Sequence, residues 1–585
     1  MRRLLFFFTF CFVVTNHVAA EGLPTLVASH PHGVYNEAFT LTLSDSIANA
    51  DVYYTTDGSV PDTTSQRYVS PLTIDCTTVL RAIVVSDDMT SRVFTSSYIF
   101  PEYVLVQTDT PAGYPNTWGS YASQSGEAKA DYGMDPEVTG IPGMSQRIVD
   151  SFYELPIVSL ATDRDNFFSL NADSEQGGIY IYTGAPVGDG IGRGWERPVS
   201  WELFGGEQNY NLQSDCGIRM HGGHGRLPEK NPKHSLRLVW RSCYGEDVFY
   251  APLFGDDAPN KYRSLVLRAP FGNAWQHWNH KDREHAQYNR DFWARTVQKR
   301  MGHVAVEGFW VHLFINGIYW GIYNVCERID DEFCVNHFGG KKDEWDVIKV
   351  DEHPSGGVLV AAEGNLERWN ELVLLVKEAA TSNNAYYRLQ GLDNNGVRDT
   401  TLVPLLDVDN FIDYMIINGY AGNTDWDHHN WYAVYNHVQP ERGFRFLCWD
   451  SEYILGDVNE NVLMPSRKHK GILTELFHHL MSNPLFLHHF QERVGLYCTA
   501  DGLLTPDSAA ALWNEISKPL AQALCAESAR WGDYRRDVHP WHGHGALYTA
   551  DNQYAAERNR LLTSYFPQRT SIYLNQLRKR GWYPE

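Results

Sequence analysis

The sequence predicts an α+β protein in which a small all-β module precedes a larger, two-lobed body that ends in helices. Three observations favour this fold class. Short runs rich in β-branched and aromatic residues dominate the first half of the chain. Apolar residues at helical spacing are frequent toward the end. The 585 residues, 43% of them hydrophobic and 21% charged, are enough for about three or four globular domains.

The first 20 residues have the pattern of a secretory signal peptide. Arg2 and Arg3 supply positive charge, residues 4–14 are apolar, and Ala19-Ala20 offers small residues for cleavage. The apolar run is too short to span a membrane, and no later run reaches about 18 apolar residues. We therefore expect an exported protein, whether secreted, periplasmic or on the cell surface, without a transmembrane helix.

The charge and the cysteine spacing argue against two kinds of binding site. The net charge of −22 argues against a nucleic-acid partner, because duplex binding depends on Lys and Arg that neutralise phosphates. Of the nine cysteines, Cys11 falls in the signal segment, and the other eight form no C-x-x-C pair. A zinc site built on that spacing is therefore not expected. An exported chain can form disulfides, but eight buried free thiols fit a chain of this size equally well.

Residues 25–101 are expected to form a β-sandwich module. The runs 38–43, 52–56 and 79–85 are rich in strand-forming residues, and Asp57-Gly58-Ser59 gives a strong turn signal. The segment resembles the module at the C-terminal end of chitobiases and hexosaminidases. In that family the module is an accessory, which implies a spacer or a binding domain here, with surface polysaccharide as its ligand class. The matching stretches are HGVYNEAFTLTLS, VYYTTDGSVPD, SPLTI and LRAIVV.

The rest of the chain divides into three expected segments. Residues 102–150 are expected to be a linker, because Pro, Gly and Ser recur and no hydrophobic period is sustained. Residues 151–455 are expected to be the core, with a helix over 284–301 and a hairpin around Asn316-Gly317. Residues 456–585 are expected to be helical and to complete the same domain.

Candidate catalytic residues lie in the stretch GNTDWDHHNWYAVYNHVQPERGFRFLCWDSE, residues 422–452. Asp425 and Asn430 have the D-x-x-x-x-N spacing that, in protein kinases, sets a catalytic Asp beside a metal-binding Asn. Asp450 follows a predicted hairpin, where kinases carry an Asp that holds Mg²⁺. A carboxylate orients a hydroxyl nucleophile and accepts its proton, and Asn and Asp oxygens suit Mg²⁺. By pattern alone, these acids fit turn caps or a structural Ca²⁺ site equally well.

Two upstream segments are consistent with phosphate chemistry. Gly222 and Gly223 make a flexible turn whose backbone can approach phosphates. Lys233 enters the next strand-like run, from where a lysine can reach the α- and β-phosphates of a nucleotide. The acids Glu284 and Asp291 on the expected helix are candidates to pair with this lysine, as a helix Glu does in kinases.

Together these segments resemble the CotH kinase family, which is named for a spore-coat protein. The resemblance implies a diverged, two-lobed protein-kinase-like fold. It also implies a protein that binds ATP with Mg²⁺ or Mn²⁺ and phosphorylates Ser or Thr of exported proteins. The matching stretches are LPIVSL, WERPVSWELF, GIRMHGG, KHSLRLVW, YGEDVFYAPLFGD, the helix with Arg290-Asp291, LFINGIYWGIYNVCERID, DVDNFIDYMIINGYAGNTDWDHHNWY and FLCWDSEYILG.

The resemblance also implies roles for individual residues. Asp425 resembles the catalytic Asp, Asn430 and Asp450 resemble the metal ligands, and Lys233 resembles the nucleotide lysine. Glu327, in VCERID, matches a characteristic acidic position of the family near the nucleotide. The glycine turn departs from the kinase pattern G-x-G-x-x-G.

Two other functions stay open at this stage. A non-catalytic surface, matrix or adhesion protein would keep the fold as a binding module, and the scarcity of ATP outside the cytoplasm favours it. A glycoside hydrolase would use a carboxylate pair such as Asp425 and Asp427. The combination of Lys233, Asp425, Asn430 and Asp450 favours the kinase.

Overall fold

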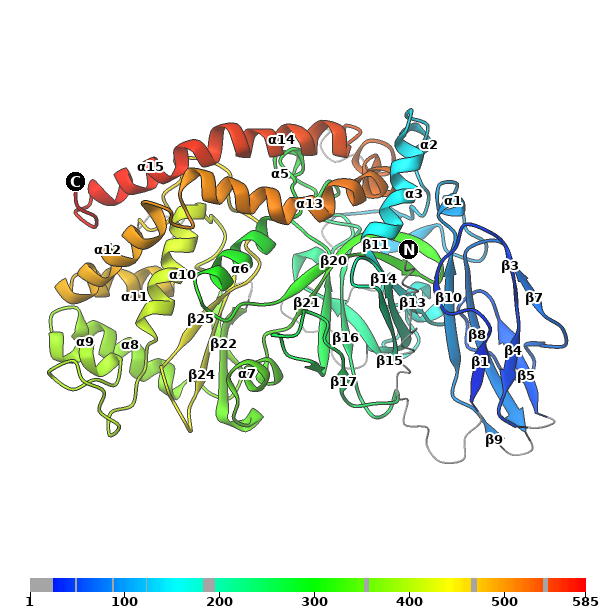
Figure 1. The fold of residues 1–585 in the computed structure, drawn as a ribbon, viewed down its shortest axis with the longest axis horizontal. Helices are drawn as coiled ribbons and strands as arrows, with labels where there is room; N and C mark the ends of the chain where they lie inside the picture. The colour runs from blue at the N-terminus through cyan, green and yellow to red at the C-terminus, as the bar shows by residue number, and fades with distance from the viewer. Residues whose placement is uncertain are drawn as a thin grey trace, which may run out of the picture.

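The structure is a computed structural model of the whole chain. It describes residues 25–47, 50–86, 89–121, 124–181, 195–351, 357–464, 471–539 and 545–585. The expected signal peptide, residues 1–20, lies outside these ranges. The fold is mixed α/β. A strand-rich region lies at the N-terminal end, a closed barrel and a second sheet follow, and helices dominate the C-terminal part (Figure 1).

The N-terminal region is built from short strands around a small core. Its main sheet has the order β2-β10-β8-β5-β6, with β9 beside β8, and β1–β4 and β3–β7 form two further pairs. Leu41, Leu80 and Tyr98 are fully buried in its core. The strands are β1 (Leu26–Ala28), β2 (Gly33–Val34), β3 (Phe39–Leu41), β4 (Leu43–Asp45), β5 (Asp51–Thr55), β6 (Gln66–Arg67), β7 (Leu72–Ile74), β8 (Thr78–Ser86), β9 (Met89–Thr90) and β10 (Phe94–Ile99).

A buried polar contact joins this region to the barrel. The carboxylate of Glu202, on barrel strand β14 (Arg197–Gly205), has no exposed surface. It accepts hydrogen bonds from the backbone N–H of Ser97 at 3.2 Å and from the Ser97 hydroxyl at 2.5 Å. His32 Nδ1 lies 2.7 Å from the same carboxylate. The strand-rich region is therefore docked onto the barrel through specific partners.

The sequence suggests a linker over 102–150, whereas the structure folds this segment into the body of the protein. Trp118 is fully buried, with its ring 5.6 Å from that of Trp320 in the barrel. Ile148 belongs to a core that also contains residues of helix α13 (Pro506–Trp531). Single large side chains anchor the segment, so a search for hydrophobic periodicity does not find it. Its elements are α1 (Pro101–Val104), β11 (Thr117–Ser120), β12 (Glu127–Lys129), α2 (Pro136–Thr139) and α3 (Met144–Glu154).

Seven strands close into a barrel in the order β13-β14-β15-β16-β19-β21-β20. Neighbouring strands are antiparallel except β13 and β20, which are parallel. The expected hairpin joins β20 to β21, and Asn316 and Gly317 have the positive φ angles, 49° and 80°, that such a tight turn requires. The barrel strands are β13 (Pro156–Ala161), β14 (Arg197–Gly205), β15 (Tyr210–His221), β16 (Ser235–Val239), β19 (Ser264–Arg268), β20 (Gly308–Ile315) and β21 (Ile318–Glu327).

A second sheet, of order β23-β22-β24-β25, packs against helices and is antiparallel throughout. Its core is rich in aromatic rings, including Trp369 and Trp431, whose centroids lie 5.4 Å apart. The helix expected over 284–301 is observed only from residue 290 onward, as α6, and Glu284 ends a separate short helix, α5. The elements are β22 (Trp345–Asp351), β23 (Val358–Glu363), β24 (Trp431–Asn436), β25 (Arg445–Cys448), α5 (His280–Glu284), α6 (Arg290–Arg300), α7 (Asp331–Phe338), α8 (Glu367–Ala379), α9 (Asn383–Leu389) and α10 (Val408–Ala421).

Helices dominate the C-terminal part, as expected. Helix α13 (Pro506–Trp531) runs along both halves of the molecule (Figure 1). It contacts α3 and β21 on the barrel side, and α6 and α15 on the other side. No helix of the described residues is both long and apolar enough to cross a membrane. The remaining helices include α11 (Ile472–Leu480), α12 (Pro484–Cys498), α14 (Ala555–Arg560) and α15 (Phe566–Arg578).

Candidate active site

A cleft of about 850 Å³ opens between the barrel and the second sheet. Its walls come from the ends of β15, β16 and β19 on one side, and from β22 and the segments after α10 and β25 on the other. Segments that lie far apart in the sequence therefore meet here. Six of the eight predicted site residues line the cleft: Gly222, Gly223, Lys233, Asp425, Asn430 and Asp450.

Lys233 lies just before β16 and is buried. Its ammonium donates to both carboxylate oxygens of Glu527, at 2.7 and 2.9 Å, and to the carbonyl of Ile322 at 2.7 Å. Burial lowers the pKa of Lys233 to about 8, although the neighbouring Glu527 carboxylate opposes this shift. Gln276 also donates to Glu527, at 2.9 Å. The lysine is thus held in place by a fully buried ion pair.

The helix acid that pairs with Lys233 differs from the two expected candidates. Glu527 lies on α13, 294 residues away along the chain. Asp291, on α6, instead contacts two arginines: its carboxylate lies 2.9 Å from Arg295 Nε and 3.7 Å from Arg268 Nε. It also accepts a hydrogen bond from the backbone N–H of Ser451 at 2.9 Å. Asp291 therefore supports the wall of the cleft around Arg268, and neither it nor Glu284 pairs with the lysine.

Asp450 follows β25 and has a left-handed backbone, with φ 59°. Its side chain is 39% exposed and pairs with the guanidinium of Arg268, which also pairs with Glu452 at 2.8 Å. Glu452 is buried and accepts hydrogen bonds from the backbone N–H groups of Phe271 and Gly272. Burial raises the pKa of Glu452, against the effect of Arg268. Arg268 thus connects two acids at the base of the cleft.

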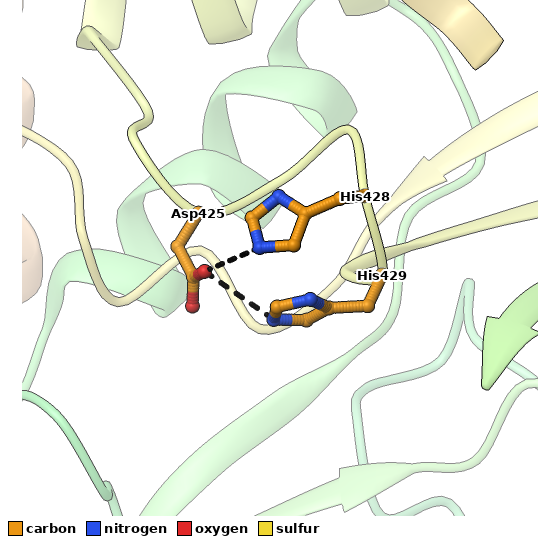
Figure 2. Close-up of side chains that lie close together, drawn as sticks. All are labelled: Asp425, His428 and His429. Atoms are coloured by element: carbon orange, nitrogen blue, oxygen red, sulfur yellow. Dashed lines mark ion pairs between the residues drawn. The ribbon is translucent and has the colours of Figure 1, made fainter. Parts of the chain in front are cut away.

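Asp425 and Asn430 lie on the loop after α10 and contact each other. Asn430 Nδ2 donates to the Asp425 carbonyl at 2.7 Å and to its carboxylate oxygen Oδ2 at 3.2 Å. Figure 2 shows the imidazoles of His428 and His429 directed at the other side of this carboxylate, with Nε2 atoms 3.2 and 3.3 Å from Oδ1. Burial raises the pKa of Asp425, but the contacts to the two histidines outweigh it and hold the pKa well below its ordinary value.

Asp427, two residues away, has a different environment. Its side chain is buried, and its two oxygens accept hydrogen bonds from the backbone N–H groups of Leu473 and Thr474, at 2.9 and 3.0 Å. These donors belong to the first turn of α11, so Asp427 caps that helix. It does not line the cleft. The hypothesised hydrolase pair of Asp425 and Asp427 therefore does not form.

The glycine turn forms one wall, and basic side chains follow it. Gly222 has φ +97°, and a side chain there would meet no atom within 4 Å, so its backbone faces open space. Arg226 and Lys230 line the same cleft, and the Lys230 ammonium lies 3.8 Å from the Trp278 ring centroid. These two basic residues were not predicted from the sequence, although their place between the glycine turn and Lys233 was a usable signal.

Glu327, which the resemblance implied to lie near the nucleotide, does not line the cleft. It ends β21, where it pairs with Leu265, whereas Arg268, at the cleft end of β19, pairs with Asn324. Three residues along a strand correspond to about 10 Å. Glu327 instead accepts a hydrogen bond from the Glu307 backbone at 3.0 Å and lies 2.9 Å from His337 Nε2.

The fold and the site define a mixed α/β protein with a charged cleft, preceded by a strand-rich region. The family model of the CotH kinase protein matches residues 218–573, which is more than half of the chain. The chain belongs to the CotH kinase protein family. The model of the chitobiase/beta-hexosaminidase C-terminal domain matches residues 30–96. Both expected resemblances are thus confirmed. Comparison with curated proteins gave no match.

Proposed function

We propose that this protein is an ATP-dependent protein kinase that transfers the γ-phosphate of ATP to Ser or Thr of exported proteins. The observation that carries the proposal is the cleft itself, which Lys233, Asp425, Asn430 and Asp450 line although they come from three separate segments. A lysine fixed by a buried helix Glu, together with an Asp, Asn and Asp set, is the donor arrangement that phosphoryl transfer uses. Family membership adds independent support.

The proposed architecture has two lobes around the cleft. The barrel, with residues 102–150 packed into it, is one lobe, and the second sheet with its helices is the other. Residues 151–455 and 456–585 then belong to one kinase-like domain, because α13 contacts both lobes. Residues 25–101 are the accessory module, and we propose surface polysaccharide as its ligand class. The proposed location is outside the cytoplasm, in keeping with the signal pattern at residues 1–20.

The residues present fit ATP with Mg²⁺ or Mn²⁺. Asn430 and Asp450 offer the hard oxygen ligands that such cations prefer, and Arg226 and Lys230 offer positive charge for phosphates. When bound, the cation would neutralise negative charge on the phosphates. Asp425 would orient the acceptor hydroxyl and take its proton.

One observation favours the alternative, a non-catalytic surface, matrix or adhesion protein. The guanidinium of Arg268 already pairs with Asp450, so this acid has a resident positive partner. A cation at Asp450 must therefore share the carboxylate with Arg268. If the protein is a kinase, Arg268 also helps to bind phosphate. If it is a non-catalytic surface protein, Arg268 takes the place of the metal.

Incubation of the purified protein with radiolabelled ATP and Mg²⁺ or Mn²⁺ separates the two functions. The kinase proposal predicts label on Ser or Thr of the protein itself or of an added acceptor, and no label when EDTA removes the metal. Absence of label, combined with no thermal stabilisation by ATP, would contradict the kinase and support the adhesion protein.

A further inference from the structure

Three potential metal ligands converge at the rim of the cleft. The Nε2 atoms of His428 and His429 lie 3.2 and 3.3 Å from the same Asp425 oxygen, and the three ligand atoms lie within 4.8 Å of one another (Figure 2). The side chains of Asp425, His428 and His429 are 29%, 46% and 19% exposed, so a cation from solvent can reach them. The D-x-x-x-x-N spacing does not require these histidines.

The loop that carries the three side chains is well anchored. Trp426 is buried, and its carbonyl accepts a hydrogen bond from the Asn430 backbone at 2.8 Å. The Asp427 carboxylate caps α11, and the Asp427 carbonyl accepts a hydrogen bond from Trp431 Nε1 at 3.1 Å. Asn430 also donates a hydrogen bond to Oδ2 of Asp425, the carboxylate oxygen that does not face the histidines. Metal-binding side chains are commonly held by such hydrogen bonds from neighbouring residues. The loop is therefore built to hold the three ligand atoms close together.

We propose that Asp425, His428 and His429 form a binding site for Zn²⁺ that regulates the proposed kinase. Zinc bonds to His nitrogen and carboxylate oxygen are about 2.0–2.2 Å long, so ligand atoms around a tetrahedral ion stand about 3.3 Å apart. The two Nε2 to Oδ1 distances match that spacing, and all three ligand atoms lie within 4.8 Å of one another. Three protein ligands leave a fourth position for water or substrate.

The ligand chemistry separates Zn²⁺ from the cation of the nucleotide. Imidazole nitrogen favours Zn²⁺, Cu²⁺ and Ni²⁺, whereas Mg²⁺ prefers carboxylates, carbonyls and water. Mg²⁺ is therefore not expected to use His428 and His429. Regulation rests on the proposed function: a carboxylate bound to Zn²⁺ no longer accepts the proton of an acceptor hydroxyl. Zinc should then inhibit phosphoryl transfer reversibly, and a chelator should restore it.

Direct binding tests the site without relying on activity. We suggest titrating the metal-free protein with Zn²⁺ by calorimetry, in an excess of Mg²⁺ and without nucleotide. The double variant His428→Gln/His429→Gln should bind at least about 100-fold more weakly, because it removes two of three ligands. The control His479→Gln/His488→Gln removes a half-buried histidine on α11 and an exposed one on α12, and should bind as the wild type does. Equal affinity of wild type and His428→Gln/His429→Gln would overturn the site.

An activity measurement then tests the regulation separately. Zinc at a concentration that fills the site should inhibit wild-type phosphoryl transfer, and EDTA followed by Mg²⁺ should restore it. If the wild type binds Zn²⁺ through the two histidines but transfers phosphate at an unchanged rate, the regulation is refuted and the site stands. If no phosphate is transferred under any metal condition, the kinase proposal fails, and the calorimetric result still decides the site.

Discussion

Glu527 of α13 and Lys233 before β16 form an ion pair with no exposed surface on either side chain, with oxygen and nitrogen 2.7 Å apart. The pair connects a C-terminal helix to the cleft in the first half of the chain. Glu527 also accepts a hydrogen bond from the Ile322 backbone at 2.8 Å, which connects it to the barrel. The position of the proposed nucleotide lysine thus depends on a helix that lies almost 300 residues downstream.

Glu527→Gln should destabilise the protein strongly. It leaves the buried Lys233 ammonium without a counter-charge, and breaking such a pair costs about 3–5 kcal/mol. The free energy of unfolding in urea at pH 7 measures the loss. Glu515→Gln on the same helix is the control, because that side chain is 60% exposed and pairs with Arg300 at the surface. It should cost less than about 1 kcal/mol. Similar losses in the two variants would contradict the role of Glu527.

Glu557 should make the free energy of unfolding depend on pH in the acidic range. Burial raises its pKa, but Arg560, His285 and Arg290 outweigh it and lower the pKa to about 2. A lowered folded-state pKa contributes stability above the ordinary value of about 4.5, and this contribution is lost as pH falls through about 2. The shift corresponds to about 3 kcal/mol. The difference in unfolding free energy between wild type and Glu557→Gln should therefore be largest near pH 6 and shrink by pH 3. A difference independent of pH would contradict this.

Local patterns in the sequence predicted several elements of the fold and part of the candidate site. The hairpin at Asn316-Gly317 is fixed by two residues that tolerate positive φ, and it forms as expected. Asp425 and Asn430 are five residues apart on one loop, so their contact is local. Asp450 reaches the same cleft through the neighbouring strands β24 and β25.

Contacts between distant segments could not be predicted in the same way. No local pattern marks Glu527 as the partner of Lys233, because that contact depends on how α13 packs. In the sequence, Arg268 cannot be distinguished from an ordinary strand residue. Its ion pairs with Asp450 and Glu452 form only in the folded protein. Glu327 was expected near the nucleotide from its motif alone, and the strand register moves it away from the cleft.

Truncation should show where the proposed catalytic domain begins. A chain that starts at residue 101 lacks the strand-rich region but keeps the folded segment 102–150. It should bind ATP with Mg²⁺ as the full-length protein does. A chain that starts at residue 145 also loses Trp118 and its packing against Trp320, so it should lose both stability and ATP binding. Thermal unfolding with and without ATP measures both effects. Full ATP binding by the shorter chain would show that 102–150 is dispensable.

Asp450→Asn should remove metal-dependent ATP binding. The variant keeps the shape of the side chain but loses the negative charge that attracts the metal cation. Arg268 retains Asp291 and Glu452 as partners. The thermal shift caused by ATP with Mg²⁺ should fall sharply, and the melting temperature without ligand should change little. Asp351→Asn is the matched control, because Asp351 lines the same cleft and is 51% exposed. If Asp351→Asn abolishes the shift and Asp450→Asn preserves it, the metal ligand has been misplaced.

Asp427→Asn should lower the free energy of unfolding and leave the rate of phosphoryl transfer nearly unchanged. Asp427 caps α11 from the neighbouring loop, and loss of a cap costs about 0.5–2 kcal/mol. Below the melting temperature, phosphoryl transfer by this variant should stay close to that of the wild type. The variant is therefore a control for Asp425, since it removes the same charge two residues away.

The rate of phosphoryl transfer from ATP in Asp425→Asn tests the kinase proposal most directly. Asp425 is the proposed base, so its loss should lower the rate by at least about 100-fold. ATP and Mg²⁺ should still bind, because Asn430 and Asp450 are unchanged. We predict that Asp425→Asn transfers phosphate slowly, that Asp427→Asn transfers it at nearly the wild-type rate, and that both variants are folded. An Asp425→Asn variant that transfers phosphate at the wild-type rate would contradict the account.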